Sequence, residues 1–429
     1  GDRCPAPGRT PGRGRARRAG LDDAVSGAAT EHGNARPIGV AVIGFGCMGR
    51  VHAQAYARVR HHFPDLGLVP DLVAVADEVP GRAEEAAAQF GFATALQDWR
   101  EVLADPRVQA VSVTAPNWLH REIGVAVAEA GRHLWIEKPV GVTADDALAV
   151  CAAVQAAGVQ SAVGFNYRNA PAVARAREVI AAGDIGRVTH ARFFFLSDYA
   201  ASPEGALTWR YDRSRGGNGV LGDLASHAVD LVLFLLGDIA SLVADTEVFI
   251  TERARPTGAT AGHVRATGGE MGAVENPDYI AALMRLGSGA RVVLEASRVA
   301  VGEQNSYGFE VHGTGGAVSW DFRRMGELSV SHESSPEDQS MRTVYVGPGA
   351  GHYGAFQPGA GIAMGYDDLK VVEAREFLRS IAEGRPFGAT LHDAVRAAVT
   401  LDALAASADG ASWVEVPDAA GARGEGRRP

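Results

Sequence analysis

The hydrophobic positions in the first third of the chain predict strands and helices that alternate. Short, nearly uniform apolar runs are separated by segments whose apolar residues recur every three or four positions. Uniformly apolar runs are typical of parallel strands that are buried on both faces. The expected strands are 39–43, 71–77, 110–115 and 133–136, and the expected helices are 51–59, 82–90, 99–103 and 121–130. This order predicts an α/β unit with a doubly wound parallel sheet over residues 36–160.

From residue 161 onward the pattern changes to longer strands with few helices between them. Helices are expected at 171–182 and 219–236, and strands at 188–196, 279–286, 290–296, 306–312 and 316–321. Strands that follow one another in this way predict a large, mostly antiparallel open sheet. Residues 251–276, which are rich in Gly, Thr and Ala, predict a long loop that could act as a lid or a subunit contact. We therefore place a second α/β domain at 161–416.

Length and composition agree with a two-domain globular protein. The chain has 429 residues, and its net charge of −10 argues against nucleic acid as a partner. We identify no apolar run near the ~20 residues that span a bilayer, so we expect no membrane association. Residues 1–35 combine arginines with Gly, Pro and Ala, which predicts a disordered basic tail, and 417–429 predict a flexible one.

The cysteines are too few and too widely spaced for a disulfide framework or a metal cluster. They are Cys4, Cys47 and Cys151. The pair Arg17-Arg18 lacks the apolar segment of a twin-arginine export signal. We therefore expect a cytoplasmic protein without a metal.

The motif Gly44-x-Gly46-x-x-Gly49 joins the first expected strand to the first expected helix. In this context the three glycines would permit a tight turn, a close approach to a pyrophosphate and close packing of helix on strand. The helix N-terminus would offer free N–H groups to the phosphates. A purely structural turn is the alternative. The predicted cofactor contacts here are Gly44, Phe45, Gly46, Cys47, Met48 and Gly49.

Asp77 closes the second strand, where an acidic residue commonly binds the adenosine ribose. A detour over residues 61–70 explains its unusually long distance from Gly49. A carboxylate here favours NAD over NADP because it repels a 2′-phosphate. The alternative is an acid in the first turn of the helix that follows Pro80-Gly81.

Polar residues also follow the third and fourth strands. Asn117 and His120 come after the expected strand 110–115. Glu137 and Lys138 come after the expected strand 133–136. Ligands of open parallel sheets bind beyond the carboxyl ends of the strands. These four residues are therefore expected at a binding site.

Asp223 and His227 lie four residues apart in the expected helix 219–236, so their side chains should share one face, which Asp230 extends. A carboxylate beside an imidazole would raise the histidine's pKa and fix its orientation. This suits a proton acceptor or relay. A hydrogen-bonded core histidine is the equally weighted alternative.

Together these motifs resemble the Gfo/Idh/MocA family of NAD(P)-dependent oxidoreductases. The resemblance covers residues 37–416. The matching residues are the three glycines of the turn, Thr114-x-Pro116-Asn117-x-x-His120, Glu137-Lys138-Pro139, Tyr167-Arg168 and Asp223-x-x-x-His227.

The resemblance implies a Rossmann domain followed by an α/β domain whose open sheet forms a homo-oligomer interface. It also implies that Lys138 touches the reacting hydroxyl, that Asp223 and His227 complete the proton pathway, and that the bond before Pro139 is cis. Further expected cofactor contacts are Asp77, Thr114, Pro116, Asn117, His120, Glu137, Lys138 and Arg168. Expected substrate contacts are Lys138, Asn166, Tyr167, Trp209, Arg210, Asp223 and His227.

The segments 164–168, 207–210, 311–316 and 343–348 resemble members of the family that oxidise pyranose sugars and glycosides. We therefore predict NAD-dependent oxidation of a secondary ring hydroxyl, at C3, of such a small-molecule substrate. Three alternatives stay open: an inositol 2-dehydrogenase, a glycosidase that works through transient oxidation by NAD, and a non-catalytic sugar sensor.

Overall fold

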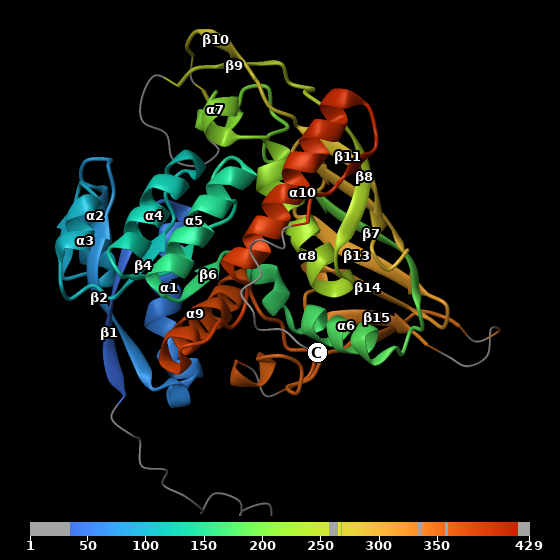
Figure 1. Ribbon diagram of the computed structural model, residues 1–429, viewed down its shortest axis with the longest axis horizontal. Helices are drawn as coiled ribbons and strands as arrows, with labels where there is room; N and C mark the ends of the chain where they lie inside the picture. Colours follow the sequence, from blue (N-terminus) through green and yellow to red (C-terminus); the bar gives the residue numbers. More distant parts are fainter. Residues whose placement is uncertain are drawn as a thin grey trace, which may run out of the picture.

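A six-stranded parallel sheet forms the first domain of the computed structural model (Figure 1), as the alternating pattern predicts. The structure describes residues 35–418 except 257–264, 267, 333–336, 338, 357 and 358. The strand order β3-β2-β1-β4-β5-β6 changes direction between β1 and β4, where doubly wound folds bind ligands. The strands are β1 (Arg36–Ile43), β2 (Leu68–Ala76), β3 (Thr94–Leu96), β4 (Ala110–Val113), β5 (His133–Ile136) and β6 (Ser161–Val163).

The region predicted as a detour is mostly regular structure. Residues 61–70 comprise the end of one helix, a 3-10 turn at Pro64–Leu66 and the start of β2. Pro70 is tolerated in β2 because β3 pairs only with residues 74–76, which leaves one side of the strand free at the proline. The helices of this domain are α1 (Cys47–His62), α2 (Arg82–Phe90), α3 (Arg100–Ala104), α4 (His120–Glu129) and α5 (Ala144–Ala157).

The second domain contains a nine-stranded sheet of order β16-β15-β14-β13-β7-β12-β11-β8-β17. Its neighbours are antiparallel except β7 and β12, which run parallel. In Figure 1 the helices α6 (Pro171–Ala182), α8 (Ser226–Leu236) and α10 (Leu391–Gly410) lie on the side of this sheet toward the first domain. The strands are β7 (Val188–Leu196), β8 (Ile239–Glu247), β11 (Tyr279–Leu286), β12 (Arg291–Ser297), β13 (Ser306–Gly313), β14 (Ala317–Asp321), β15 (Glu327–Ser331), β16 (Arg342–Tyr345) and β17 (Val414–Glu415).

The helix expected at 219–236 is irregular at its start. A short helix, α7 (Arg213–Gly216), precedes a π-helical turn at Leu221–Ala225, and α8 follows directly. By length and composition alone the helical segment Arg213–Leu236 could span a bilayer, contrary to the sequence analysis, but 78% of its apolar window is buried inside the protein. It serves as the central helix of the second domain.

The expected long loop at 251–276 is partly a hairpin. Its ends form β9 (Glu252–Ala254) and β10 (Met271–Ala273), which pair antiparallel. Met271 lies opposite Ala254 in this pairing, so the two ends of the segment lie side by side. Residues 257–264 and 267 of this segment lie outside the described residues. So do the predicted tail 1–35 up to residue 34 and the predicted tail 417–429 from residue 419 onward.

Helix α9 (Tyr366–Glu383) returns the chain to the first domain and packs against α1. Val371 and Phe377 of α9 belong to the same buried apolar cluster as Val40 and Val42 of β1. One face of the parallel sheet is thus covered by a helix encoded more than 200 residues after the last strand of that sheet.

Candidate active site

The glycine turn after β1 has the geometry that a dinucleotide requires. Gly44 has φ +87°, and a Cβ on it would lie 2.6 Å from the backbone N of Ala115. A Cβ on Gly49 would lie 2.4 Å from the carbonyl oxygen of Gly44, whereas one on Gly46 would meet nothing within 4 Å. Two glycines are therefore required for packing, and the third leaves open space at the start of α1, where N–H groups attract phosphate. The glycine turn and the start of α1 therefore fit the pyrophosphate of NAD.

Asp77 lies directly after β2 and is largely buried. One carboxylate oxygen accepts the N–H of Phe45 at 2.6 Å, and the other accepts the N–H of Val79 at 2.9 Å. The guanidinium of Arg82 lies 3.1 Å from the same carboxylate. Asp77 thus orients the glycine turn, and its contact with a ribose stays a prediction.

Lys138 connects the two domains. It follows β5, and its bond to Pro139 is cis, as the resemblance implies. Its Nζ donates to the carbonyl oxygen of Asp223 at 2.8 Å and lies 3.5 Å from one carboxylate oxygen of the same residue. The hydroxyl of Tyr199 donates to the other carboxylate oxygen. Tyr199 was not expected at the site, since no motif marks it.

His227 lies beside this pair in an aromatic environment. Its ring is 4.7 Å from that of Tyr167 and 6.0 Å from that of Phe195, measured between centroids. Burial, followed by the positive charge of Lys138, lowers the pKa of His227 well below 6.5. Asp223 does raise this pKa, as expected, but burial and Lys138 outweigh the carboxylate, so the net shift is downward. His227 is therefore neutral near pH 7 and can accept a proton.

Three residues predicted to touch the cofactor are engaged by the protein itself. The hydroxyl of Thr114 donates to the carbonyl of Gly44, and both ring nitrogens of His120 lie 2.7 Å from backbone carbonyl oxygens, those of Pro139 and Ala115. Arg168 is buried and ion-paired with Asp230 and Asp393. These contacts favour positioning roles, and cofactor binding by the three residues stays a prediction.

A pair of tryptophans also joins the two domains. Trp118 follows β4, and its ring centroid lies 5.0 Å from that of Trp209. The guanidinium of Arg210 stacks 4.4 Å from the Trp209 ring. Asn166 and Tyr167 are buried in the 3-10 turn Asn166–Asn169 after β6. Trp118 was missed, although its position within the motif that contains Pro116 and Asn117 marks it.

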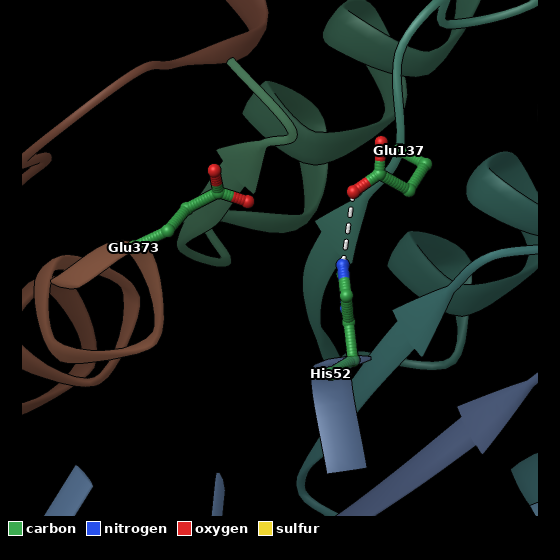
Figure 2. A group of neighbouring side chains, drawn as sticks. All are labelled: His52, Glu137 and Glu373. Carbon is green, nitrogen blue, oxygen red and sulfur yellow. Dashed lines mark hydrogen bonds and ion pairs between the residues drawn. The ribbon is translucent and has the colours of Figure 1, made fainter. Parts of the chain in front are cut away.

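A buried charge network lies behind Lys138. Figure 2 shows His52 of α1, Glu137 after β5 and Glu373 of α9 with their polar ends turned toward one another. The Nε2 of His52 is 3.0 Å from Glu137, and the ammonium of Lys370 contacts Glu137 and lies 3.0 Å from Glu373. The three ligand-type side chains would suit a metal, but Lys370 supplies the cation there.

The network shifts the pKa values of its members. Burial lowers the pKa of His52 to about 4. Burial opposes ionisation of Glu137, yet the charge of Lys370 and the hydrogen bond from His52 hold its pKa well below the usual range. Glu137 is also packed against Gly164, where a Cβ would lie 2.4 Å from the carboxylate. The network therefore fixes the segment that carries Lys138.

Both domains match models of one family. Residues 38–165 match the oxidoreductase family model with an NAD-binding Rossmann fold, and residues 173–319 match the GFO/IDH/MocA C-terminal domain. The chain belongs to the Gfo/Idh/MocA oxidoreductases and is a dehydrogenase of the sugar and polyol class, with NAD as its cofactor.

Among its relatives is the levoglucosan dehydrogenase of Pseudarthrobacter phenanthrenivorans, which is 37% identical over 89% of this chain and 98% of its own length. A solved structure of levoglucosan dehydrogenase with NADH and levoglucosan is 35% identical, with a TM-score of 0.84 over 89% of this chain and all of the other. The myo-inositol 2-dehydrogenase of Thermotoga maritima is 25% identical over 81% of this chain and 89% of its own length.

Proposed function

We propose that the protein oxidises the C3 hydroxyl of a pyranose sugar or glycoside, such as levoglucosan, to a ketone, with NAD as the oxidant. The observation that carries the proposal is the contact of Lys138, which follows β5, with Asp223, four residues before His227 in the chain. The similarity to levoglucosan dehydrogenase over 89% of the chain supports the substrate class.

The side chains of the site suit the handling of one hydroxyl proton. NAD, when bound, accepts the hydride from the substrate carbon. Lys138, held by Asp223, would hydrogen-bond the reacting oxygen, and neutral His227 would take up the proton. Trp209 offers an apolar ring face to the sugar, and its contact with Trp118 holds that face between the domains.

The proposal is tested by incubating the full-length protein with NAD and a panel of pyranoses, glycosides and inositols while NADH absorbance is followed. We expect NADH formation with levoglucosan or a related pyranose, and NMR of the product should place the carbonyl at C3. A carbonyl at another carbon would refute the position. Turnover of inositols alone would favour the inositol dehydrogenase alternative, which the relative from Thermotoga maritima also supports.

We also propose a cytoplasmic homo-oligomer built on the outer face of the nine-stranded sheet. Leu283 of β11 and Val293 of β12 are paired neighbours on this face and are 52% and 43% exposed. Exposed apolar side chains at the centre of a sheet are typical of an interface. Light scattering should give the mass of a dimer or a tetramer for the wild type. The variant Leu283→Glu should have a smaller mass in solution. A monomeric wild type would refute the proposal.

A further inference from the structure

A cavity lies next to the candidate catalytic residues. It has a volume of about 220 Å³ and is formed by the segment 199–211 together with Arg265. One wall is Tyr199, whose hydroxyl donates to Asp223. Lys138 and His227 do not line the cavity. It is therefore a neighbour of the site at which the hydroxyl reacts, and a single tyrosine side chain is shared between the two.

The polar lining of the cavity suits a polyhydroxylated group. The cavity is lined by Tyr199, Ser202, Thr208 and Tyr211, whose side chains each carry a hydroxyl, and by Arg265, whose side chain carries a guanidinium. The hydroxyl of Thr208 is buried and has no hydrogen-bond partner within the described protein. Since an unsatisfied buried hydroxyl is costly, a rotation of the Thr208 side chain that turned its hydroxyl into the cavity, toward a ligand hydroxyl, would be favourable.

The cavity is held in shape by a buried arginine. Arg253 donates to the carbonyl oxygens of Ala200 at 2.5 Å and Ser202 at 2.8 Å. Its guanidinium also stacks 4.5 Å from the Tyr211 ring. Gly205 is required beside it, because a Cβ there would lie 2.5 Å from Nη1 of Arg253. A preformed cavity binds its ligand with little loss of conformational entropy.

We infer that this cavity is a second sugar subsite, which binds the ring of a glycoside that is not oxidised; the inference rests on the proposed function. Its volume of about 220 Å³ is many times the ~10–15 Å³ that one water molecule needs, so the cavity has room for a larger polar group. The oxidised ring would lie at Lys138, and the glycosidic bond would pass Tyr199. A disaccharide or a glycoside with a sugar aglycone would then be a better substrate than a free monosaccharide.

The test compares kcat/KM for a glucose monosaccharide with the values for α-linked and β-linked glucose disaccharides, by NADH formation with the full-length protein. We expect at least one disaccharide to be favoured by about 10-fold or more. Thr208→Val removes the hydroxyl at constant shape and should lower kcat/KM for that disaccharide by about 5-fold more than for the monosaccharide, mainly through KM. Arg265→Ala should act in the same direction.

Arg213→Ala is the control that matches Arg265→Ala. It also removes one guanidinium charge, but from an exposed position on α7 outside the cavity. This control should change kcat/KM by the same factor for the monosaccharide and for the disaccharide.

Two results would overturn the subsite. One is oxidation of the monosaccharide without any preference for a disaccharide, and the other is an equal loss of kcat/KM for both substrates in Thr208→Val. If no sugar is oxidised, the proposed function fails. In that case the subsite is tested by calorimetric titration of the disaccharides into the wild type and Thr208→Val. Weaker binding by the variant would support the subsite. Equal binding by both proteins, or no binding, would overturn it.

Discussion

The ammonium group of Lys370 contacts the carboxylate of Glu137, although 233 positions separate the two residues in the sequence. Both side chains are almost fully buried, and Glu373 provides a second carboxylate 3.0 Å from the same ammonium. The ammonium of Lys370 therefore holds the carboxyl groups of Glu137 and Glu373. Glu137 directly precedes Lys138, the residue that contacts Asp223. Stability and the geometry of the site both depend on this ion pair.

Replacing Lys370 by Met should destabilise the protein strongly. The buried carboxylate of Glu137 would lose its cation, and breaking a buried ion pair typically costs about 3–5 kcal/mol. Urea denaturation should show this loss. Arg379→Met on the same helix is the control, because its partly exposed pair with Glu383 should contribute no more than about 1 kcal/mol. Similar losses in both variants would contradict the assignment.

Lys138→Met and His227→Asn should each lower kcat by about 10²-fold or more, because both residues act on the proton of the reacting hydroxyl. NADH binding, followed by fluorescence, should change far less. Tyr199→Phe should have a smaller effect, since its hydroxyl reaches the reaction only through Asp223. Near-normal turnover in either of the first two variants would show that the residue is structural.

NAD should be preferred to NADP in the wild type. Asp77→Ser should shift the preference toward NADP, because the variant removes a negative charge while Arg82, now 3.1 Å from the carboxylate, becomes available to a 2′-phosphate. In Asp77→Ser/Arg82→Ala the gain with NADP should disappear. The ratio of kcat/KM for the two cofactors measures the effect. An unchanged ratio in Asp77→Ser would show that the carboxylate does not select the cofactor.

His52 should make the protein less stable in acid. Its pKa is about 4 in the folded state and 6.5 for an unburied histidine. Between these values only the unfolded state binds the proton, so the free energy of unfolding falls as pH falls, by up to about 1.4 kcal/mol per pH unit.

His52→Gln keeps a donor for Glu137 and removes this titration. Between pH 7.5 and pH 5 the variant should therefore lose about 2 kcal/mol less stability than the wild type, as measured by urea denaturation at each pH. His61→Gln, at an exposed position on the same helix, is the control and should follow the wild type. Parallel pH profiles for wild type and His52→Gln would contradict the prediction.

The sequence predicts the parts of the fold that depend on local periodicity. Strand 133–136 and helix 171–182 are observed with the predicted bounds, and the cis bond before Pro139 follows from the family resemblance. Features that depend on distant partners were not predicted. The π-helical turn at Leu221–Ala225 looks like ordinary helix in the sequence, because the same apolar spacing serves both.

The candidate site shows the same division between local and distant features. The glycine turn and the sequence around Lys138 carry local motifs. Tyr199 and Lys370 act through contacts with residues far away in the chain, and a tyrosine or lysine in an amphipathic segment carries no mark of such a role. The net direction of the His227 pKa shift was not predicted, because the degree of burial of His227 depends on aromatic rings from several elements.

The position of α9 determines when the nucleotide-binding domain can complete its folding. A ribosome releases residues 36–163, with all six strands of the parallel sheet, long before it reaches Val371 and Phe377. Until then, the apolar surface around Val40 and Val42 lacks part of its cover, and Glu137 lacks its cation. The nascent first domain is thus expected to be a client for chaperones during synthesis. The segment that carries Lys138 is likewise expected to reach its final order only after Lys370 has been made.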